Sequence, residues 1–499
     1  MPTRVAVGVM AWLGFINLSM TRFNLSVIIV AMVGTSISNT TQGYCYNYTS
    51  TGMTPASQDE VTSIVNTPPT YDLEGEFDWS ETIQGLVLGS FYYGYFMTQV
   101  VGGRLAERYG AKWVFGVSIL SGGVANLLTP TAARLHYGVL IALRAMQGFF
   151  QGVTWPSMHA CLAQWIPPLE RPNFVAFVYF GTALGQAVTL PLCGIIIHTM
   201  GWAAAFYVTG SVSLIWCLMW FSAMHSKPAH HPRISREELQ YIENAIRSSG
   251  TSSKGPPRIP WKNIATSLPV WAIIVCDIGN SWGISLFNAQ LPTFMKNILG
   301  FNITMNSYLS ALPFLSRYLG GMIISVLSRW ILKHGYFSII NTRRVFSAIS
   351  QLVPAVMLVG LIHTGCNSVA IVAIICIALF FNGAISSGHI INHHDIAPNL
   401  SGTLFGINNT FFNFVSFTAP VVTGVLIDGQ QTLGQWRKAF WICVPMYVVG
   451  ELFFLFFLSG TVQPWNSSEP ETPALTPLTT TVDTSEIFPN KHDDPSNKL

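Results

Sequence analysis

Two permanently charged arginines lie within stretches that are otherwise apolar enough to cross a membrane. Arg144 is followed by Gln147 and Gln151 in the run YGVLIALRAMQGFFQG, and spacings of three and four place all three on one helix face. Arg22 lies in a second such run near the N-terminus. A guanidinium cannot lose its proton in a protein, and a charge at the bilayer centre costs at least about 2.5–3.5 kcal/mol. These residues therefore need polar partners inside the protein.

The chemistry that fits these residues is the binding of an anion. Arg22 shares its run with Asn17, Asn24 and Ser26, which form a polar stripe, and neither arginine has an evident carboxylate partner in this half of the chain. Arginine binds phosphate or carboxylate through two parallel N–H groups, so an anion would supply the missing charge. The alternative is that the arginines are structural, bonded to backbone carbonyl groups or reaching the membrane interface.

The apolar runs of the second half of the chain contain fewer charged residues. Asp277 lies within VCDIGNSWG, and a carboxylate inside a membrane helix is a candidate functional group. It could bind a coupling cation or proton, or it could form an ion pair with Arg317. Asn280, three residues after Asp277, is a further candidate for contact with the substrate.

The composition indicates that membrane helices position these residues. Of 499 residues, 50% are hydrophobic and 9% are charged, against about 25% charged residues in soluble domains. A span needs about 20 largely apolar residues. The candidate spans are 6–33, 83–103, 112–130, 137–163, 174–198, 204–223, 269–290, 307–328, 346–364, 369–390, 402–426 and 437–459. Two sets of six spans are a common transporter plan, with the substrate held between them near mid-membrane.

These spans divide the chain into four expected parts. They are a six-helix half at 1–223 with an outer loop at 34–82, a cytoplasmic central loop at 224–268, a second six-helix half at 269–459, and a tail at 460–499. The tail has few apolar residues to bury, so we expect it to be disordered.

The distribution of charge predicts the orientation of the spans. Lys and Arg are absent from 34–82 and frequent in 224–268, which places both termini in the cytoplasm. The acidic loop 34–82 then lies outside, and it carries N-glycosylation acceptor patterns at Asn39 and Asn47. Cys45 and Cys366 both fall on the outer side and could pair.

Several classes of function are excluded by the sequence. It has no HExxH or Walker pattern, so we expect no enzyme activity. The net charge of +3 is small and its basic residues follow the membrane orientation, so nucleic-acid binding is not expected. The eight cysteines include no CxxC pair, so no metal site is expected.

The turn after the second span carries a family motif. GGRLAERYGAK, Gly102 to Lys112, places Gly103, Glu107, Arg108 and Lys112 on a tight cytoplasmic connection. It resembles the loop signature of the major facilitator superfamily, which usually has Asp where this chain has Glu107. The resemblance implies an all-α polytopic membrane protein with 12 transmembrane helices in two six-helix halves. It also implies that the motif gates the protein by latching the halves on the cytoplasmic face.

Further stretches resemble one branch of that superfamily, the anion:cation symporter family. They are RFNLSV, GSFYYGYFMTQVVGG, WIPPLER, HPRISREE, LSALPFL and INHHDIAPNLSGTLFGINNT, and the resemblance covers nearly all of 1–465. Arg22 and Arg144 match basic positions of this family on spans that line its central cavity. Its proton-coupled branches have glutamate at one or both positions of Gln147 and Gln151, and its vesicular glutamate branch has histidine in place of Leu88. The pattern is therefore similar to the sodium–phosphate cotransporter branch.

The resemblance also suggests roles for three residues of the second half. Glu451 is expected to be peripheral, because it matches a position that usually faces away from the cavity. His389 and His393 lie inside a family motif at a helix end, so we expect them to be structural or to act in gating.

We therefore expect a secondary active transporter that works by alternating access and moves inorganic phosphate or an organic anion, coupled to Na⁺. The alternatives are an H⁺-coupled symporter of acidic sugars or organic anions and, from a different class, an anion channel. We expect no cofactor beyond the co-transported Na⁺ or H⁺. The expected partners are a small anion, the cation and the lipid bilayer. We expect a monomer in the plasma membrane rather than in a lysosome or synaptic vesicle.

Overall fold

The long apolar segments form long helices, and polar or flexible residues mark their ends. The computed structural model describes residues 2–33, 75–167, 170–248, 259–429 and 431–466. Five helices begin after a side chain that accepts a hydrogen bond from the backbone N–H three residues later, as helix-capping residues do: Ser80, Asn302, Ser338, Asn367 and Thr432. Gly110 and Gly201 each join two helices with φ angles of 89° and 83°, which glycine adopts without strain.

The first half and the central segment contain the following helices. They are α1 (Thr3–Met32), α2 (Glu81–Tyr109), α3 (Ala111–Leu135), α4 (Tyr137–Gln151), α5 (Thr154–Trp165), α6 (Arg171–Met200), α7 (Trp202–Ala223), η2 (Pro228–His230) and α8 (Arg236–Ser248).

The second half contains the remaining helices. They are α9 (Trp261–Thr266), α10 (Leu268–Asn297), α11 (Ile303–Lys333), α12 (Ile339–His363), α13 (Ser368–Asn382), η3 (Gly383–Ser386), α14 (Asn392–Ile396), η4 (Pro398–Leu400), α15 (Ser401–Ile427), α16 (Leu433–Phe457) and η5 (Pro464–Asn466).

The predicted all-α membrane fold is confirmed. In the described part of the chain, ten helices are long and apolar enough to cross a membrane. The other two expected spans coincide with α2 and with α4 and α5 taken together. The tail at 467–499 lies outside the described residues, and the predicted boundaries of the two halves stay predictions.

Two spans that we expected to be continuous are interrupted. Between α4 and α5 the chain turns at Gly152 and Val153. Pro156 has no backbone N–H to donate to the carbonyl of Gly152, which removes the hydrogen bond that would continue the helix. The tenth span ends as an α-helix at Asn382 and continues as η3 and a run of turns before α14.

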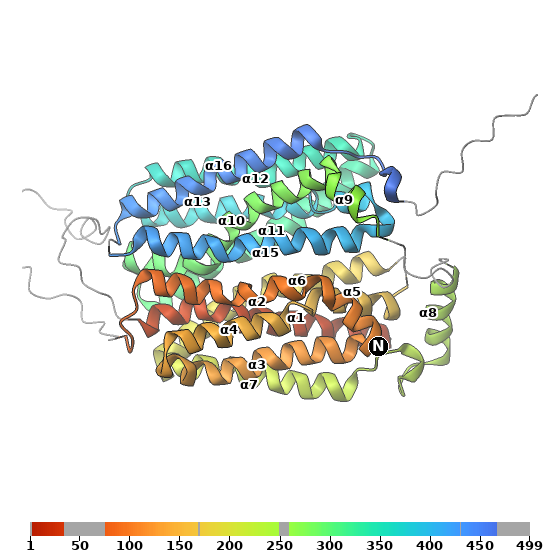
Figure 1. Cartoon of the computed structure of the whole chain (residues 1–499), viewed down its shortest axis with the longest axis horizontal. Coiled ribbons are helices and arrows are strands. Elements are labelled where there is room, and N and C mark those ends of the chain that lie inside the picture. Colours follow the sequence, from red (N-terminus) through yellow and green to blue (C-terminus); the bar gives the residue numbers. More distant parts are fainter. Residues whose placement is uncertain (1, 34–74, 168–169, 249–258, 430, 467–499) are drawn as a thin grey trace, which may run out of the picture. The chain divides into compact units, whose positions relative to one another are not determined.

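The two halves contact each other through equivalent spans. α2, the second span of the first half, packs against α15, the fifth span of the second half. α11 and α6 form the reciprocal pair, and α1 packs against α10. In Figure 1 the helices of the first half, red to yellow, and those of the second half, green to blue, form two neighbouring groups.

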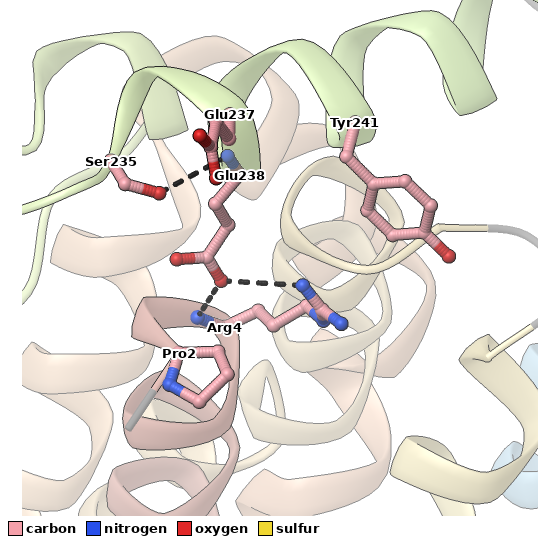
Figure 2. A pocket seen from close by; sticks show the side chains of 6 residues that line it. All are labelled: Pro2, Arg4, Ser235, Glu237, Glu238 and Tyr241. Atoms are coloured by element: carbon pink, nitrogen blue, oxygen red, sulfur yellow. Dashed lines mark hydrogen bonds and ion pairs between the residues drawn. The ribbon is translucent and has the colours of Figure 1, made fainter.

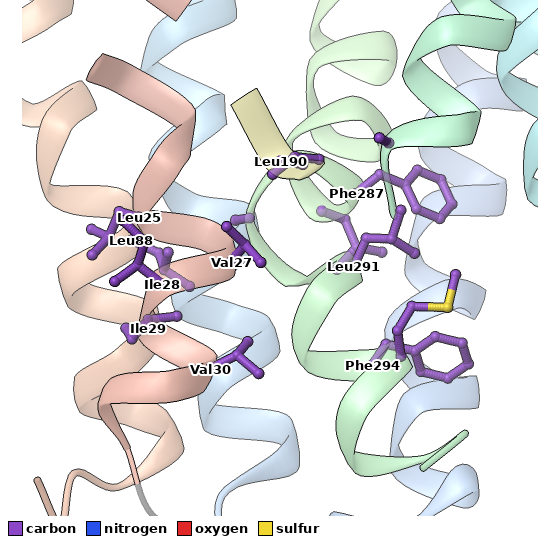
Figure 3. Packing of buried hydrophobic residues seen from close by; sticks show 14 of the residues in the cluster. Leu25, Val27, Ile28, Ile29, Val30, Leu88, Leu190, Phe287, Leu291 and Phe294 are labelled. Carbon is purple, nitrogen blue, oxygen red and sulfur yellow. The ribbon is translucent and has the colours of Figure 1, made fainter. Parts of the chain in front are cut away.

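Within the described residues, one large cluster of buried apolar side chains contains residues of both halves. On the side of loop 34–80, here called the acidic-loop side, one cluster joins Ile28 of α1, Leu190 of α6 and Phe294 of α10 (Figure 3). The Lys296 Nζ donates to the Val30 backbone carbonyl across the same region, at 2.6 Å. Toward the linker 224–267, here called the linker side, the apolar residues of each half form separate clusters. Apolar packing therefore seals the halves together on the acidic-loop side.

The crossing of α2 and α4 depends on glycine. A Cβ added to Gly148 would collide with the backbone carbonyl of Phe91, and one added to Gly94 would collide with that of Ala145. We expect Gly148→Ala to destabilise the folded protein by about 1–3 kcal/mol, because overpacked sites must displace their neighbours. The measurement is the thermal transition of the detergent-solubilised protein.

The matched control for this crossing is Gly360→Ala in α12. A Cβ at Gly360 would meet nothing within 4 Å, so its transition temperature should stay close to that of the wild type. Equal transition temperatures for the two variants would contradict the inferred close crossing.

Candidate functional site

Arg22 extends from α1 into a group of aromatic side chains. Its guanidinium carbon lies 4.8 Å from the ring centres of Tyr92 and Tyr95, 4.9 Å from that of Phe91 and 5.1 Å from that of Phe23. The side chain is only partly buried, and its Nε has no hydrogen-bond partner in the described structure. The aromatic faces stabilise the cation without supplying a counter-charge. The sequence signal for this group is the spacing of Tyr92 and Tyr95 within FYYGY, which places both on one helix face.

Arg144 of α4 lies behind Arg22 and is 2% exposed. Its Nη1 donates to the Thr21 carbonyl at 3.2 Å and to Gln147 Oε1 at 2.8 Å, and its Nη2 donates to the Arg22 carbonyl at 3.0 Å. The side chain therefore clamps α1 to α4 through backbone oxygens, which was the structural alternative for an arginine. Its Nε stays without a partner in the described structure.

The two glutamines complete the same contact between α1 and α4. The Gln147 Nε2 donates to the Thr21 carbonyl at 3.0 Å, and the Gln151 Nε2 donates to the Thr21 hydroxyl at 3.2 Å. Both side chains are buried, and Gln151 Oε1 has no partner in the described structure. Arg144, Gln147 and Gln151 thus lie on one face, as their spacing predicts.

The polar stripe expected beside Arg22 is wrong in part. The Asn24 amide donates to Asn126 Oδ1 at 3.0 Å and to Thr209 Oγ1 at 3.1 Å, and Asn17 Oδ1 accepts from Ser213 at 3.2 Å. These partners belong to α3 and α7, so the two asparagines hold α1 inside its own half and do not face the same way as Arg22.

The two arginines form a site of uncompensated positive charge. Within the residues that the structure describes, neither guanidinium has a carboxylate oxygen within 4.0 Å. The Phe91 ring lies close to both guanidinium groups, at 4.9 Å and 5.5 Å. Arg22 is the more exposed of the two, so the arrangement can bind an anion at Arg22 with Arg144 adding charge from behind.

Asn280 connects to the third arginine at membrane depth. Its Oδ1 accepts a hydrogen bond of 2.8 Å from Asn382, whose own Oδ1 accepts one of 2.9 Å from Arg317 Nε. Asn280 itself is 1% exposed. The structure therefore brings Asn280 into a chain of amides within the second half, and not into contact with Arg22 or Arg144.

Asp277 has partners other than the expected one. Its Oδ1 lies 3.4 Å from His389 Nε2, and its Oδ2 accepts a hydrogen bond of 2.6 Å from Asn408. In the described structure Arg317 forms no ion pair with Asp277, although its charge lies near enough to influence it. The ion pair with Arg317 that was one alternative for Asp277 is therefore replaced by a contact with His389.

Glu451 is central to the second half rather than peripheral. It is fully buried, and its Oε2 accepts hydrogen bonds from the Ser347 hydroxyl at 2.7 Å and the Cys276 thiol at 3.5 Å. Helix α16 turns this residue inward, toward α10 and α12, so the family-based expectation for Glu451 is wrong. A carboxylate within VVGELFFLFF was itself the signal for an interior role.

The model of the Major Facilitator Superfamily matches residues 11–420 of this sequence. The chain belongs to the major facilitator superfamily. Human sialin is 38% identical over 465 residues, which cover 93% of this chain and 90% of sialin. A putative inorganic phosphate cotransporter of Drosophila melanogaster is 37% identical, covering 97% and 90%. Vesicular glutamate transporter 1 of Bos taurus is 32% identical, covering 94% and 79%.

Solved structures show the same fold at low sequence identity. A D-xylose–proton symporter superposes with a TM-score of 0.64 at 14% identity, covering 91% of this chain and 98% of that one. A bacterial homologue of the human lysosomal transporter spinster, inward-facing and occupied, gives 0.63 at 12%, covering 92% and 97%. This member of the major facilitator superfamily is a multi-pass membrane transporter and not an enzyme.

The superfamily motif lies where α2 meets α3, on the linker side. The Arg108 guanidinium lies 5.6 Å from the Tyr109 ring centre, and the Lys112 Nζ lies 5.6 Å from that of Trp113. The surroundings of Gly103 and Glu107 lie outside the described structure, so the latch between the halves stays a prediction. Asn39 and Asn47 are likewise outside it, and their glycosylation stays a prediction.

On the linker side, α8 of the central segment contacts the start of α1. The Glu238 carboxylate of α8 accepts from the backbone N–H of Thr3 at 2.9 Å. It also accepts from the backbone N–H of Arg4 at 3.0 Å (Figure 2). The Arg4 Nε donates to Glu170 at 3.1 Å, and the Tyr241 hydroxyl donates to the same carboxylate at 3.1 Å. Burial acts to raise the pKa of Glu238, but the N–H donors outweigh it and hold the pKa below its ordinary value. The carboxylate therefore stays ionised and caps α1 at neutral pH.

Proposed function

We propose that this chain is a secondary active transporter that moves a small anion by alternating access, with the anion bound at Arg22. One observation carries the proposal: the Arg22 residue is only partly buried, lies next to the buried cation of Arg144, and has no carboxylate partner in the described part of the chain. An anion that neutralises this charge lowers the cost of closing the protein over it.

The substrate class that we propose is inorganic phosphate or an organic carboxylate. Both present oxygen pairs that match the two N–H groups of a guanidinium. The names of similar proteins support this substrate class. These proteins include sialin and putative inorganic phosphate cotransporters, at 36–38% identity. Residence in the plasma membrane and the monomeric state stay predictions.

The apolar seal on the acidic-loop side supports a particular step of the cycle. Because α1, α6 and α10 pack together there, we propose that this is the conformation that exchanges substrate on the linker side. Return to the opposite conformation then requires Lys296 to release the Val30 carbonyl and the apolar contacts around it to separate.

Sodium is the coupling ion that the sequence predicts, because the amides of Gln147 and Gln151 exchange no proton in the physiological range. A proton is a second candidate, and a specific observation favours it. Gln147 Oε1 accepts from Arg144, so a sodium ion at that oxygen would lie beside a guanidinium. The buried carboxylates and histidine of the second half, in contrast, can exchange a proton.

Uptake of radiolabelled phosphate by proteoliposomes tests the proposed function. Sodium is replaced by choline at fixed pH, and a proton gradient is then imposed in sodium-free medium. An acidic monosaccharide and a dicarboxylate serve as competitors. We expect saturable uptake of unmodified anion that requires a cation gradient. Uptake that stays linear with concentration would indicate a channel, and no uptake or exchange of any of these anions would contradict the proposal.

A further inference from the structure

We propose that Asp277, His389 and Glu451 form a binding site for a single proton, with Ser347 as the bridge along which that proton moves. The site lies in the second half, away from Arg22 and Arg144, and it draws its residues from α10, α12, α16 and the segment between η3 and α14. The role of this site in transport rests on the proposed function. The geometry of the site does not depend on the proposed function.

The site is buried and lies at membrane depth. Asp277 is 4% exposed, and His389, Ser347 and Glu451 are 0% exposed. Asp277 follows the start of α10 by nine residues, which corresponds to about 14 Å along a helix. Glu451 precedes the end of α16 by six residues, or about 9 Å. Both helix ends lie on the linker side, so a proton has its shorter path to the site from that side.

The site has more contacts than hydrogens unless a proton is added. The Ser347 hydroxyl and the Cys276 thiol each have one hydrogen, and each lies within bonding distance of both Glu451 Oε2 and His389 Nδ1. If a neutral His389 carries its hydrogen on Nδ1, both groups donate to Glu451, and the lone pair of Nε2 faces Asp277 Oδ1 at 3.4 Å with no hydrogen between them. If the hydrogen is on Nε2, one of the two groups must turn its hydrogen from Glu451 to Nδ1, and the contact that it leaves at Glu451 lacks a hydrogen. Either tautomer of the neutral histidine therefore leaves a contact of the site without a hydrogen.

One added proton satisfies the whole chain in either of two arrangements. In the first, His389 is doubly protonated and donates to Asp277 through Nε2. In the second, Glu451 is protonated and donates to the Ser347 oxygen, the Ser347 hydroxyl donates to Nδ1, and His389 keeps its hydrogen on Nε2. Interconversion moves a hydrogen across each of two contacts and changes no other bond. Ser347 therefore relays the proton between a histidine and a carboxylate.

The sum of the charges around the site also indicates that it binds one proton. The titratable groups that face the site are the two carboxylates, the Cys276 thiol of α10, Arg317 of α11 and His393 of α14. His393 interacts electrostatically with Asp277 and His389. With both carboxylates ionised and Arg317 permanently charged, the set carries a charge of −1 until it takes up one proton. A buried net charge is costly, and Glu451 Oε1 has no donor in the described structure.

Because the site is neutral only with the proton bound, its protonation state influences which conformation the second half adopts. The protonated site is neutral and can stay buried, as it is in the structure. Loss of the proton leaves one uncompensated charge, which water must reach, so deprotonation favours a conformation in which the site opens to the linker side. We infer that the second half closes with the proton bound and releases it on that side.

Two readouts test this inference on the full-length protein. The first is infrared difference spectroscopy of the purified protein between acid and alkaline buffers, which detects the C=O stretch of a protonated carboxyl group without any substrate. The second compares gradient-driven uptake of labelled phosphate in proteoliposomes with exchange of labelled for unlabelled phosphate at equal pH, which needs no net proton movement.

We expect Glu451→Gln, Asp277→Asn and His389→Gln to lose proton-gradient-driven uptake and to retain exchange, because each removes an exchangeable proton. Glu451→Gln should also remove a component of the infrared difference. Ser347→Ala should lose driven uptake in the same way, and Ser347→Thr should restore it by keeping the hydroxyl. Ser350→Ala is the matched control, since Ser350 is buried on the same helix and only donates to the Ser347 carbonyl.

Three results would overturn the inference: unchanged driven uptake in the carboxylate variants, an infrared difference that Glu451→Gln and Asp277→Asn leave intact, or wild-type uptake driven by sodium with no response to pH. Failure of the proposed function looks different, because the wild-type protein would then exchange none of the tested anions. The infrared arm would still decide whether the site binds a proton.

Discussion

Anion uptake is expected to fall below detection in Arg22→Ala, while the folded yield stays near that of the wild type. Arg22 packs on the faces of four aromatic rings, so its removal leaves other rings to hold α1 against α2. The loss is then mainly one of binding. A hydrogen bond to a charged group contributes about 1.5–3 kcal/mol, and each 1.4 kcal/mol is a factor of ten. Loss of a two-pronged contact should therefore raise KM by at least about a hundredfold.

The comparison with Arg144 makes this prediction specific to the anion. Arg144→Ala removes the guanidinium donors to the buried carbonyls of Thr21 and Arg22, and a hydrogen bond to a charged group contributes about 1.5–3 kcal/mol. The substitution should therefore reduce the yield of folded protein as well as uptake. Arg144→Lys should rescue poorly, because an ammonium cannot reproduce three donor contacts fixed by a planar group. Arg22→Lys keeps a charge near the substrate but cannot make both N–H contacts, so it should retain measurable uptake with a raised KM.

Fluorescence-detected size-exclusion chromatography measures folded yield, and the concentration dependence of uptake measures KM. An Arg22→Ala variant with an unchanged KM would remove Arg22 from the anion site. A well-folded Arg144→Ala variant with only KM raised would contradict the structural role of Arg144 and would place the anion at Arg144 instead of Arg22.

The helices were predictable from the sequence because they depend on local properties. An apolar run of about 20 residues must bury its backbone polar groups in a helix to enter a bilayer, and this holds whatever the neighbouring helices are. The errors arose where packing intervened. Pro156 interrupts the fourth span, and the tenth span leaves the α-helical form after Asn382, where Gly383 packs closely on the backbone of Arg317.

The partners of the polar residues were less predictable, because they depend on how each helix is rotated and what it meets. Spacing alone placed Arg144, Gln147 and Gln151 on one face, but nothing in the run YGVLIALRAMQGFFQG shows that this face meets the carbonyls of Thr21 and Arg22. Asp277, His389 and Glu451 are separated by more than 50 residues from one another, so only the assembled second half brings them together.

Uptake by Gln147→Glu is expected to be strongly reduced at neutral pH and to recover as the pH falls. The Gln147 amide accepts a hydrogen bond from Arg144 at 2.8 Å and donates one to the Thr21 carbonyl at 3.0 Å. An ionised carboxylate keeps the first contact and cancels the charge that Arg144 adds behind Arg22. It also places a negative oxygen against the Thr21 carbonyl, which it cannot donate to.

Acid reverses both effects, which fixes the sign of the pH dependence. Once protonated, the introduced carboxyl is neutral and its O–H can donate to the Thr21 carbonyl, which restores the hydrogen bonds of the wild-type amide. Gln151→Glu is the matched control, because the Gln151 amide bonds to the Thr21 hydroxyl at 3.2 Å, and a hydroxyl can donate to a carboxylate. Uptake should be measured from pH 7.5 down to the lowest pH at which the wild type stays active, with each variant normalised to the wild type. A flat ratio for Gln147→Glu, or an equal pH response in both variants, would mean that the charge of Arg144 does not reach the substrate.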